Sequence, residues 1–220
     1  MGGGSRHTAI VRRTWKETER LEGAVLEVEP ELAARYVRPG QVVTLSSVPG
    51  GEKVYLALAS FPGERFALEV LLGAGAQQKL TLSVGQELEI SEPFGAGFPL
   101  DRASGREILI FAVGSAIASV RPLIEHFRRD RGQYGRIRAY LGAHTTNDFP
   151  YRAEYFGWSS DQVEVIQSIS RPYVQDRFRA DSPPASDAMA YVSGMKAMVQ
   201  GCTEALTESG FSPDRIGRNW

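Results

Sequence analysis

The sequence contains a single cysteine, Cys202, and only three histidines. One thiol cannot form a disulfide within the chain, and one cysteine is too few to hold an iron–sulfur cluster. The histidines His7, His126 and His144 are far apart and lack the spacing of metal ligands. We therefore expect no disulfide framework, no iron–sulfur cluster and no metal site in this chain.

The chain also lacks an excess of charge and any long apolar segment. Its 25 Lys and Arg residues nearly balance its 26 Asp and Glu residues, which gives a formal net charge of −1. This balance gives no reason to expect nucleic acid or an anionic membrane surface as a partner. No apolar run approaches the roughly 20 residues of a membrane span, and the N-terminus lacks the apolar core of a secretory signal. The sequence predicts a cytoplasmic protein with no nucleic-acid or membrane partner.

What residues 8–90 do show is a hydrophobic pattern with a period of about two. Short β-like runs are separated by turns rich in Pro and Gly. These runs are Thr8–Thr14, Gly23–Val28, Gln41–Ser47, Lys53–Ser60, Arg65–Leu72 and Glu87–Ser91. Short strands at close spacing, without long helical patterns between them, favour a small antiparallel β-barrel.

The pattern changes after a connector rich in Gly and Pro at Pro93–Gly105. From there, strands alternate with helices, which is typical of a parallel sheet with right-handed crossovers. The expected strands are Ile108–Val113, Arg136–Ala143, Gln162–Ile169 and Ala188–Val192, and the expected helices are about Ser119–Arg129, Tyr151–Phe156, Tyr173–Arg177 and Lys196–Ser209. We place the domain boundary in the connector, which gives a β-barrel domain at 1–98 and an α/β domain at 99–220.

Four turns follow the carboxyl ends of the predicted parallel strands. They are Gly114–Ala118, Gly142–Asn147, Ser168–Arg171 and Ser193–Met198. Because ligands of such sheets bind at the carboxyl ends of the strands, these turns define one candidate edge. At the first of them, a buried strand, a small-residue turn and a helix can together present backbone N–H groups to a phosphate. The alternative is a turn whose residues are small only because it is tightly packed.

Several segments along most of the chain match a known series of motifs. Tyr36–Val43 (Y-V-R-P-G-Q-V-V) is similar to an x-x-P-G-Q-[FY]-V barrel strand, and Ile90–Phe98 (I-S-E-P-F-G-A-G-F) is similar to a G-P-x-G-x-x-F segment. Gly114–Ala118 (G-S-A-I-A) is similar to G-T-G-I-A. Further similarities are Tyr140–Thr145 with Tyr151–Tyr155 to Y-G-A-R-T…Y-x-x-E-F, Tyr173–Asp176 to Y-V-Q, Ser193–Met198 to C-G-P-x-x-M, and Asp214–Trp220 to an R-I-x-x-N tail with an aromatic end. In this order, the motifs resemble those of the ferredoxin–NADP reductase superfamily.

The resemblance implies a Greek-key antiparallel β-barrel of the FAD-binding type, followed by an α/β nucleotide-binding domain with a parallel sheet. It also implies hydride transfer between a nicotinamide nucleotide, NAD(P)H, and a flavin held against the barrel, with FAD as the expected flavin. By the same resemblance, the pyrophosphate would bind the backbone of the first turn, at Gly114, Ser115, Ala116 and Ile117. Pro93 and Phe94, in the segment that leaves the barrel, are carried over as cofactor-binding residues.

The resemblance also assigns roles near the reacting rings. Ser193 replaces the Cys that lies near the nicotinamide in many members, and Gly194 with Met195 follows it in the turn that the nicotinamide would approach. Trp220 would lie over the flavin ring, as terminal aromatics do in some members. The alternative for Trp220 is an aromatic side chain that only fills a groove.

The flavin signature of the family, R-x-[YF]-[ST]-[IL]-[AS]-S, is incomplete here. The matching stretch is Val54–Ser60 (V-Y-L-A-L-A-S). Val54 stands where the family has the Arg for the flavin phosphate, Leu56 replaces the stacking aromatic, and Ala57 replaces the hydroxyl that binds the ring. Lys53 offers a replacement charge, as a flexible point charge rather than a fork. Tight retention of FAD is therefore in doubt.

Several residues of these flavin elements remain candidates for binding the cofactor. They are Leu58, Ala59 and Ser60, which agree with the signature, together with Tyr55 and, in the G-x-[ST] element that here reads G-A-G-A, Gly75 and Ala76. Tyr55 is one position out of register with the family's aromatic. Because neighbours on a strand face opposite sides, only a bulge would turn Tyr55 to the side of Leu56.

On the nucleotide side, Ser170 and Arg171 resemble the S-R pair that takes the 2′-phosphate of NADPH, and Tyr173 would stack on adenine. Arg is well suited to phosphate. The loop to Tyr173 is shorter than in NADP-specific relatives, so the resemblance favours NADPH over NADH only weakly. The alternative is a capping Ser and a solvated Arg.

Two classes of function therefore remain. The first is a flavin-dependent NAD(P)H oxidoreductase that passes electrons to a protein partner or a small acceptor, with the flavin either resident or a loosely held substrate. The second is a descendant that has lost tight flavin binding and acts as a module for a protein partner or a nucleotide. The ordered motifs favour the enzyme, and the depleted strand at Val54–Ser60 favours the module.

Overall fold

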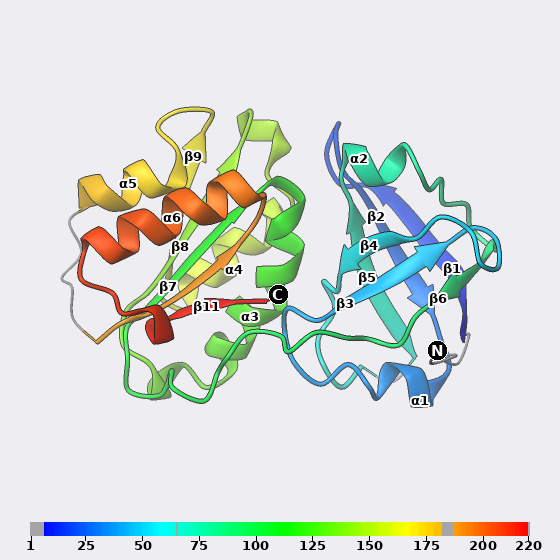
Figure 1. Ribbon diagram of the computed structural model, residues 1–220, viewed down its shortest axis with the longest axis horizontal. Coiled ribbons are helices and arrows are strands. Elements are labelled where there is room, and N and C mark those ends of the chain that lie inside the picture. Colours follow the sequence, from blue (N-terminus) through cyan, green and yellow to red (C-terminus); the bar gives the residue numbers. More distant parts are fainter. Residues whose placement is uncertain (1–6, 65, 182–186, 220) are drawn as a thin grey trace.

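The computed structural model describes residues 7–64, 66–181 and 187–219, which form two halves side by side (Figure 1). The first half is a six-stranded antiparallel sheet in the order β4-β3-β6-β1-β2-β5. Its elements are β1 (His7–Lys16), β2 (Glu22–Glu27), α1 (Pro30–Ala33), β3 (Val42–Ser46), β4 (Val54–Ala57), β5 (Ala67–Leu72), α2 (Ala74–Gln77) and β6 (Glu87–Ile90). All six predicted strands are confirmed. A bridge between Leu58 and Val70 joins the two outer strands and brings the sheet close to a barrel.

The second half is a five-stranded parallel sheet in the order β11-β10-β7-β8-β9. Its elements are β7 (Ile108–Val113), α3 (Ile117–Arg129), β8 (Ile137–Ala143), α4 (Tyr155–Ser160), β9 (Val163–Ile169), α5 (Val174–Asp181), β10 (Met189–Ser193), α6 (Lys196–Glu208) and β11 (Ile216–Arg218). The prediction of a parallel sheet is confirmed. The sequence pattern missed β11 because three residues are too few to show a period, and α4 begins four residues later than predicted.

Apolar side chains form three cores. One fills the barrel, and one lies between the parallel sheet and α5 with α6. The third covers the other face of the sheet beneath α3 and α4, and it also includes Leu21, Ala59, Leu71 and Phe98 from the N-terminal half and the segment that leaves it. Because both halves contribute to this third core, they are packed against each other through apolar contacts. Among the described residues, no helix is long and apolar enough to cross a membrane.

Cys202 lies on α6 in the core beneath α5 and is fully buried. Burial raises the pKa of its thiol to about 12, because a thiolate is poorly solvated there. We expect native protein to react with a thiol-specific chromogenic disulfide at least about a hundredfold more slowly than protein unfolded in guanidinium, which should titrate one thiol. Rapid reaction of the native protein would show that α6 opens readily.

Candidate functional site

The turn after β7 joins a strand to a helix, as the sequence pattern predicts. Gly114 has a φ of +53°, a single turn of 3-10 helix spans Gly114–Ala116, and α3 begins at Ile117. Ile117 is buried and anchors the helix, whereas Ser115 is exposed. A Cβ added to Gly114 would meet nothing within 4 Å. The turn therefore faces open space at the carboxyl end of the sheet.

The turn after β10 lies next to this one. The Ser193 side chain is 2% exposed, and its Oγ lies 2.7 Å from the Oγ of Ser119 on α3. Ser119 also donates to the carbonyl of Ala116, at 2.8 Å. Beyond Ser193, Gly194 packs against Met198, and Met195 is 72% exposed. The two predicted cofactor turns are thus joined by a hydrogen bond between serines.

The turn after β9 is held by its backbone. Ser170 has a φ of +53°, its N–H donates to the carbonyl of Ala143, and its Oγ donates to the carbonyl of His144. The guanidinium of Arg171 lies over the ring of Tyr173, at 5.4 Å. Within the described residues no carboxylate pairs with Arg171. The structure thus brings Arg171 and Tyr173 together at the same edge of the sheet as Gly114.

On the barrel, the side chains of β4 face other directions than the comparison with the family's flavin signature implies. Val54 and Leu56, at the positions of the family's Arg and aromatic, point into the barrel core. Tyr55 points outward, and the pairing of β4 with β3 runs without a bulge. Its ring is 68% exposed and meets the edge of Phe94, 41% exposed, with 6.2 Å between ring centroids. The accessible aromatic surface of this strand therefore belongs to Tyr55, and no bulge is needed to present it.

The residues that follow β4 are buried. Leu58 lies in the barrel core, and Ala59 lies in the core shared by the two halves. The Oγ of Ser60 accepts a hydrogen bond from the N–H of Glu69, and its carbonyl accepts one from the hydroxyl of Tyr36. These three residues therefore shape the strand rather than offer exposed side chains.

The start of α2 meets the turn after β7. A Cβ added to Gly73 would lie 3.0 Å from the Oγ of Ser115, so the two turns touch across the interface. Gly75 faces open space and Ala76 is half-buried. The two turns with predicted cofactor-binding residues, one from each half, are therefore neighbours.

The C-terminal tail crosses from the sheet to the barrel (Figure 1). Arg218 of β11 pairs with Val192 of β10, and Asn219 then donates from Nδ2 to the carbonyl of Gly40 at 3.2 Å. Gly95, which follows Phe94, lies beside the carbonyl of Asn219. The tail thus links the strand of Ser193 to the exposed aromatic pair. Trp220 lies outside the described residues.

An ionic cluster at the boundary between the halves is one that the sequence pattern did not indicate. Arg121 of α3 binds Glu154 through Nε and Nη2 at 2.7–3.0 Å, and it reaches Glu69 of β5 at 3.2 Å. Burial raises the pKa of Glu69, against the opposing charge of Arg121. Burial alone would lower the pKa of Arg121, but the hydrogen bond to Glu154 and the charges of both carboxylates raise it. Long-range pairs of this kind leave no local signal in a sequence.

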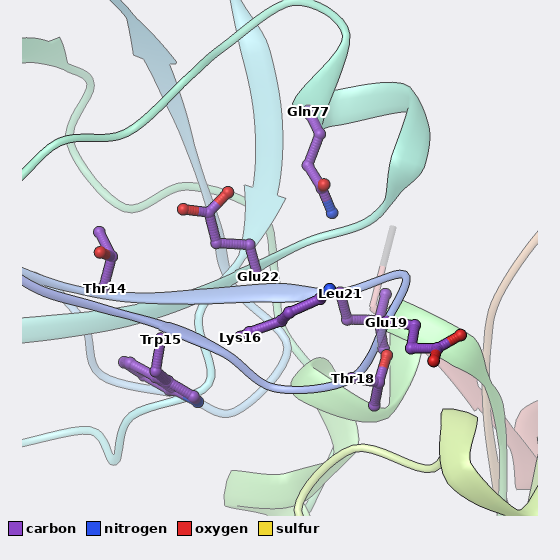
Figure 2. A pocket seen from close by; sticks show the side chains of 8 residues that line it. All are labelled: Thr14, Trp15, Lys16, Thr18, Glu19, Leu21, Glu22 and Gln77. Atoms are coloured by element: carbon purple, nitrogen blue, oxygen red, sulfur yellow. The ribbon is translucent and has the colours of Figure 1, made fainter.

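A separate pocket of about 440 Å³ lies between the β1–β2 hairpin and α2. In Figure 2 the Gln77 side chain extends from α2 toward the hairpin, where its Nε2 donates to the carbonyls of Arg20 and Leu72. The remaining lining is Thr14, Trp15, Lys16, Thr18, Glu19, Leu21 and Glu22. None of the predicted site residues lines this pocket, so it is distinct from the edge described above. Among the described residues, no three potential metal ligands gather.

We compared the chain with known proteins by sequence and by structure. No family model matches the chain. The chain is 28% identical over 217 residues to the gamma subunit of sulfhydrogenase 1 from Pyrococcus furiosus, covering 91% of the chain and 73% of the relative. It is 23% identical over 203 residues to the gamma subunit of sulfhydrogenase 2 from the same organism, covering 81% and 70%.

Solved structures agree on the architecture. The cytochrome P450 reductase GcoB of Amycolatopsis superposes with a TM-score of 0.85 at 19% identity, over 98% of this chain and 69% of that one. A ferredoxin–NADP+ reductase from Plasmodium falciparum superposes with a TM-score of 0.77 at 14% identity, over 97% and 95%. The chain has the fold of the ferredoxin–NADP reductases. Within that fold, it is a distant homologue of the sulfhydrogenase gamma subunits.

Proposed function

We propose that this chain is an NAD(P)H-dependent flavoprotein reductase that passes electrons to a protein acceptor. The fold and the distant homology support an oxidoreductase of the ferredoxin–NADP reductase type. The observation that carries the proposal is the path of the tail, which joins the strand of Ser193 to the loop of Phe94 through Asn219. The tail therefore connects the predicted nicotinamide turn to the exposed aromatic pair of Tyr55 and Phe94.

The residues on the two sides of the tail fit the two cofactors. Tyr55 and Phe94 offer an accessible aromatic surface against which a flavin ring can pack. Gly75 and Gly114 both face open space, which leaves room for phosphates at the two neighbouring turns. When bound, the flavin and the nicotinamide would supply the redox chemistry of hydride transfer.

The chain's own residues would bind and orient. The backbone of the turn from Gly114 would hold the nucleotide pyrophosphate, and Arg171 with Tyr173 would hold the adenosine end. Because the described carboxylates leave Arg171 unpaired, its guanidinium favours a nucleotide with a 2′-phosphate. Ser193 would present a small hydroxyl beside the nicotinamide, in an orientation set by Ser119.

The proposal of a protein acceptor comes from the relatives. The curated matches are named as subunits of sulfhydrogenases. Among the similar solved structures, one is named as a cytochrome P450 reductase and one as a ferredoxin reductase in carbazole 1,9a-dioxygenase. The chain's one cysteine is buried, so electrons that leave a flavin here would pass to a group outside the cores of this chain. A partner protein that carries its own redox centre fits this need.

A second candidate, a reductase-like module without tight flavin binding, is favoured by one observation. The outward residues of β4 are Tyr55 and Ala57, and neither supplies a cation for a flavin phosphate. Lys53, just before the strand, is exposed and is a flexible replacement.

A visible absorption spectrum separates the two candidates. The protein is purified without added cofactor, then soaked with FAD or FMN and desalted. A retained flavin spectrum that bleaches anaerobically on addition of NADPH or NADH supports the reductase. A colourless protein that releases both flavins, yet binds NADPH in a calorimeter, supports the module.

Replacing Tyr55 tests the aromatic surface. We expect Tyr55→Ala to weaken flavin binding about fivefold, because a stacked aromatic contact contributes on the order of 1 kcal/mol. Fluorescence titration with FAD measures the change. Phe156→Ala is the control, since Phe156 is 85% exposed on α4 and should leave flavin affinity unaltered. An equal effect of both substitutions, or of neither, would remove Tyr55 from the flavin site.

A further inference from the structure

Arg121 is the only residue of α3 for which the described contacts join three separate segments by ionic or hydrogen bonds. Besides Glu154 and Glu69, its Nη1 donates to the carbonyl of Ala59 at 2.9 Å. Its guanidinium also lies 4.6 Å from the ring centre of Tyr151. The side chain is 19% exposed. An arginine of one half is thus fixed to the end of the predicted flavin strand in the other.

The backbone at Ala59, which accepts a hydrogen bond from Arg121, is also held by hydrogen bonds from the barrel. The N–H of Ala59 donates to the carbonyl of Glu69 at 2.8 Å, and the Oγ of Ser60 accepts from the N–H of Glu69. The carbonyl of Ser60 accepts from the hydroxyl of Tyr36 at 2.9 Å. Because the backbone at Ala59 and Ser60 is hydrogen-bonded on both sides, a movement of Arg121 would shift this backbone with it.

The fork of arginine suits this position. On one side, its donors bind both oxygens of the Glu154 carboxylate, and on the other side they reach the Glu69 carboxylate and the carbonyl of Ala59. The single ammonium group of a lysine cannot make this set of contacts. Two carboxylates, Glu69 and Glu154, share the one guanidinium, and a third, Glu17 of the hairpin after β1, accepts from the N–H of Tyr151. Removing the guanidinium would leave Glu69 and Glu154 without their cation.

The same turn of α3 contacts the nicotinamide side. Ser119, two residues before Arg121, is hydrogen-bonded to Ser193 at the end of β10. Residues two apart on a helix point to nearly opposite sides. The start of α3 therefore stands between the turn of Ser193 and the strand end at Ala59, with one polar contact to each.

We propose that this first part of α3 is a spacer that sets the distance between the nicotinamide and flavin sites, with Ser119 and Arg121 as positioning residues. The inference rests on the proposed function for its consequence, because hydride transfer depends steeply on the distance between the reacting rings. Neither residue is assigned a contact with either cofactor. Loss of the spacer should slow transfer while leaving both cofactors bound.

The first test measures the spacing without any cofactor. Lys53→Cys and Lys196→Cys place spin labels on the barrel and on α6, both at exposed positions, while buried Cys202 stays unlabelled. We expect Arg121→Met to shift or broaden the distance distribution between the labels. Arg136→Met is the control, because two donors of Arg136 reach Oε2 of Glu164, at 3.0 and 2.6 Å, within the α/β half. Equal distributions in both variants would overturn the spacer.

The second test measures flavin reduction by NADPH in a single turnover. We expect Arg121→Met to slow the reduction about 10–100-fold, the effect of a misplacement near 1 Å, with flavin and NADPH affinities within about twofold of the parent. Added guanidinium chloride at low millimolar concentration should restore part of the rate by refilling the vacated position. A loss of affinity as large as the loss of rate would make Arg121 a binding residue and overturn the proposal.

Two further variants protect the test against unfolding. Glu154→Gln keeps the shape of the side chain but removes one charge, and Ser119→Ala removes the contact to Ser193. Each should slow flavin reduction less than Arg121→Met does, with unchanged affinities for flavin and NADPH. A parent protein that binds no flavin would refute the proposed function. The label distances would still decide the spacer in that case.

Discussion

Gly114→Ala is expected to weaken NADPH binding by at least about tenfold while leaving flavin binding unchanged. The added Cβ would enter the open space at the carboxyl end of β7, and the φ of +53° is a conformation that costs an L-residue about 1–2 kcal/mol. The backbone would relieve this strain by turning its N–H groups away from the position of the phosphate. Isothermal titration with NADPH, and separately with FAD, measures both affinities.

Gly105 supplies the control for backbone strain alone. It has a φ of +75°, and a Cβ there also meets nothing within 4 Å, but it lies in the connector before β7. Gly105→Ala should therefore lower stability by a similar amount, about 1 kcal/mol, without affecting NADPH. Equal loss of NADPH affinity in the two variants would mean that the turn at Gly114 is not the phosphate site.

The fold was predictable because its signals are local. Alternating residues in β1–β6 and the apolar run of β7 both reflect burial on one or two faces of a strand, so the change of period at the connector marks the change of architecture. The four turns at the sheet edge could be placed because parallel strands end on the same side.

The barrel side of the site was harder to predict because it depends on which face of one strand points inward. The comparison with the flavin signature put Leu56 at the position of the family's stacking aromatic. The structure places Leu56 in the barrel core and Tyr55 on the outside. A register error of one residue reverses every side chain of a strand, and no local pattern in a four-residue strand corrects it.

The contacts between the halves left no sequence signal at all. Arg121 meets Glu69 and Ala59 across more than 50 positions, and Asn219 meets Gly40 from the other end of the chain. None of these three pairs has a spacing that a helix or strand repeats. Such contacts emerge only once the barrel and the sheet are assembled, because they report the packing of two finished units.

Gly40→Ala is expected to be the most destabilising of the substitutions considered, because Gly40 lies where the tail meets the barrel. It has a φ of +89°, and a Cβ would lie 2.7 Å from the ring of Phe98 and 2.8 Å from Cβ of Asn219. Phe98 is fully buried and packs edge-on against Tyr191, so it cannot move aside without disturbing the shared core. Overpacking of about 1–3 kcal/mol adds to a backbone strain of about 1 kcal/mol, for a loss of about 2–4 kcal/mol in the free energy of unfolding.

Gly63 separates the two causes of this loss. Its φ of +92° matches that of Gly40, but a Cβ there would meet nothing within 4 Å. Gly63→Ala should lower the free energy of unfolding by about 1 kcal/mol only, which corresponds to a fall in Tm of about 2–4 °C, whereas Gly40→Ala should lower Tm by about 5–15 °C. Thermal unfolding followed by circular dichroism measures both. If Gly40→Ala costs no more than Gly63→Ala, the tail yields without strain, and Asn219 does not fix the path from β11 to the barrel on which the proposed function depends.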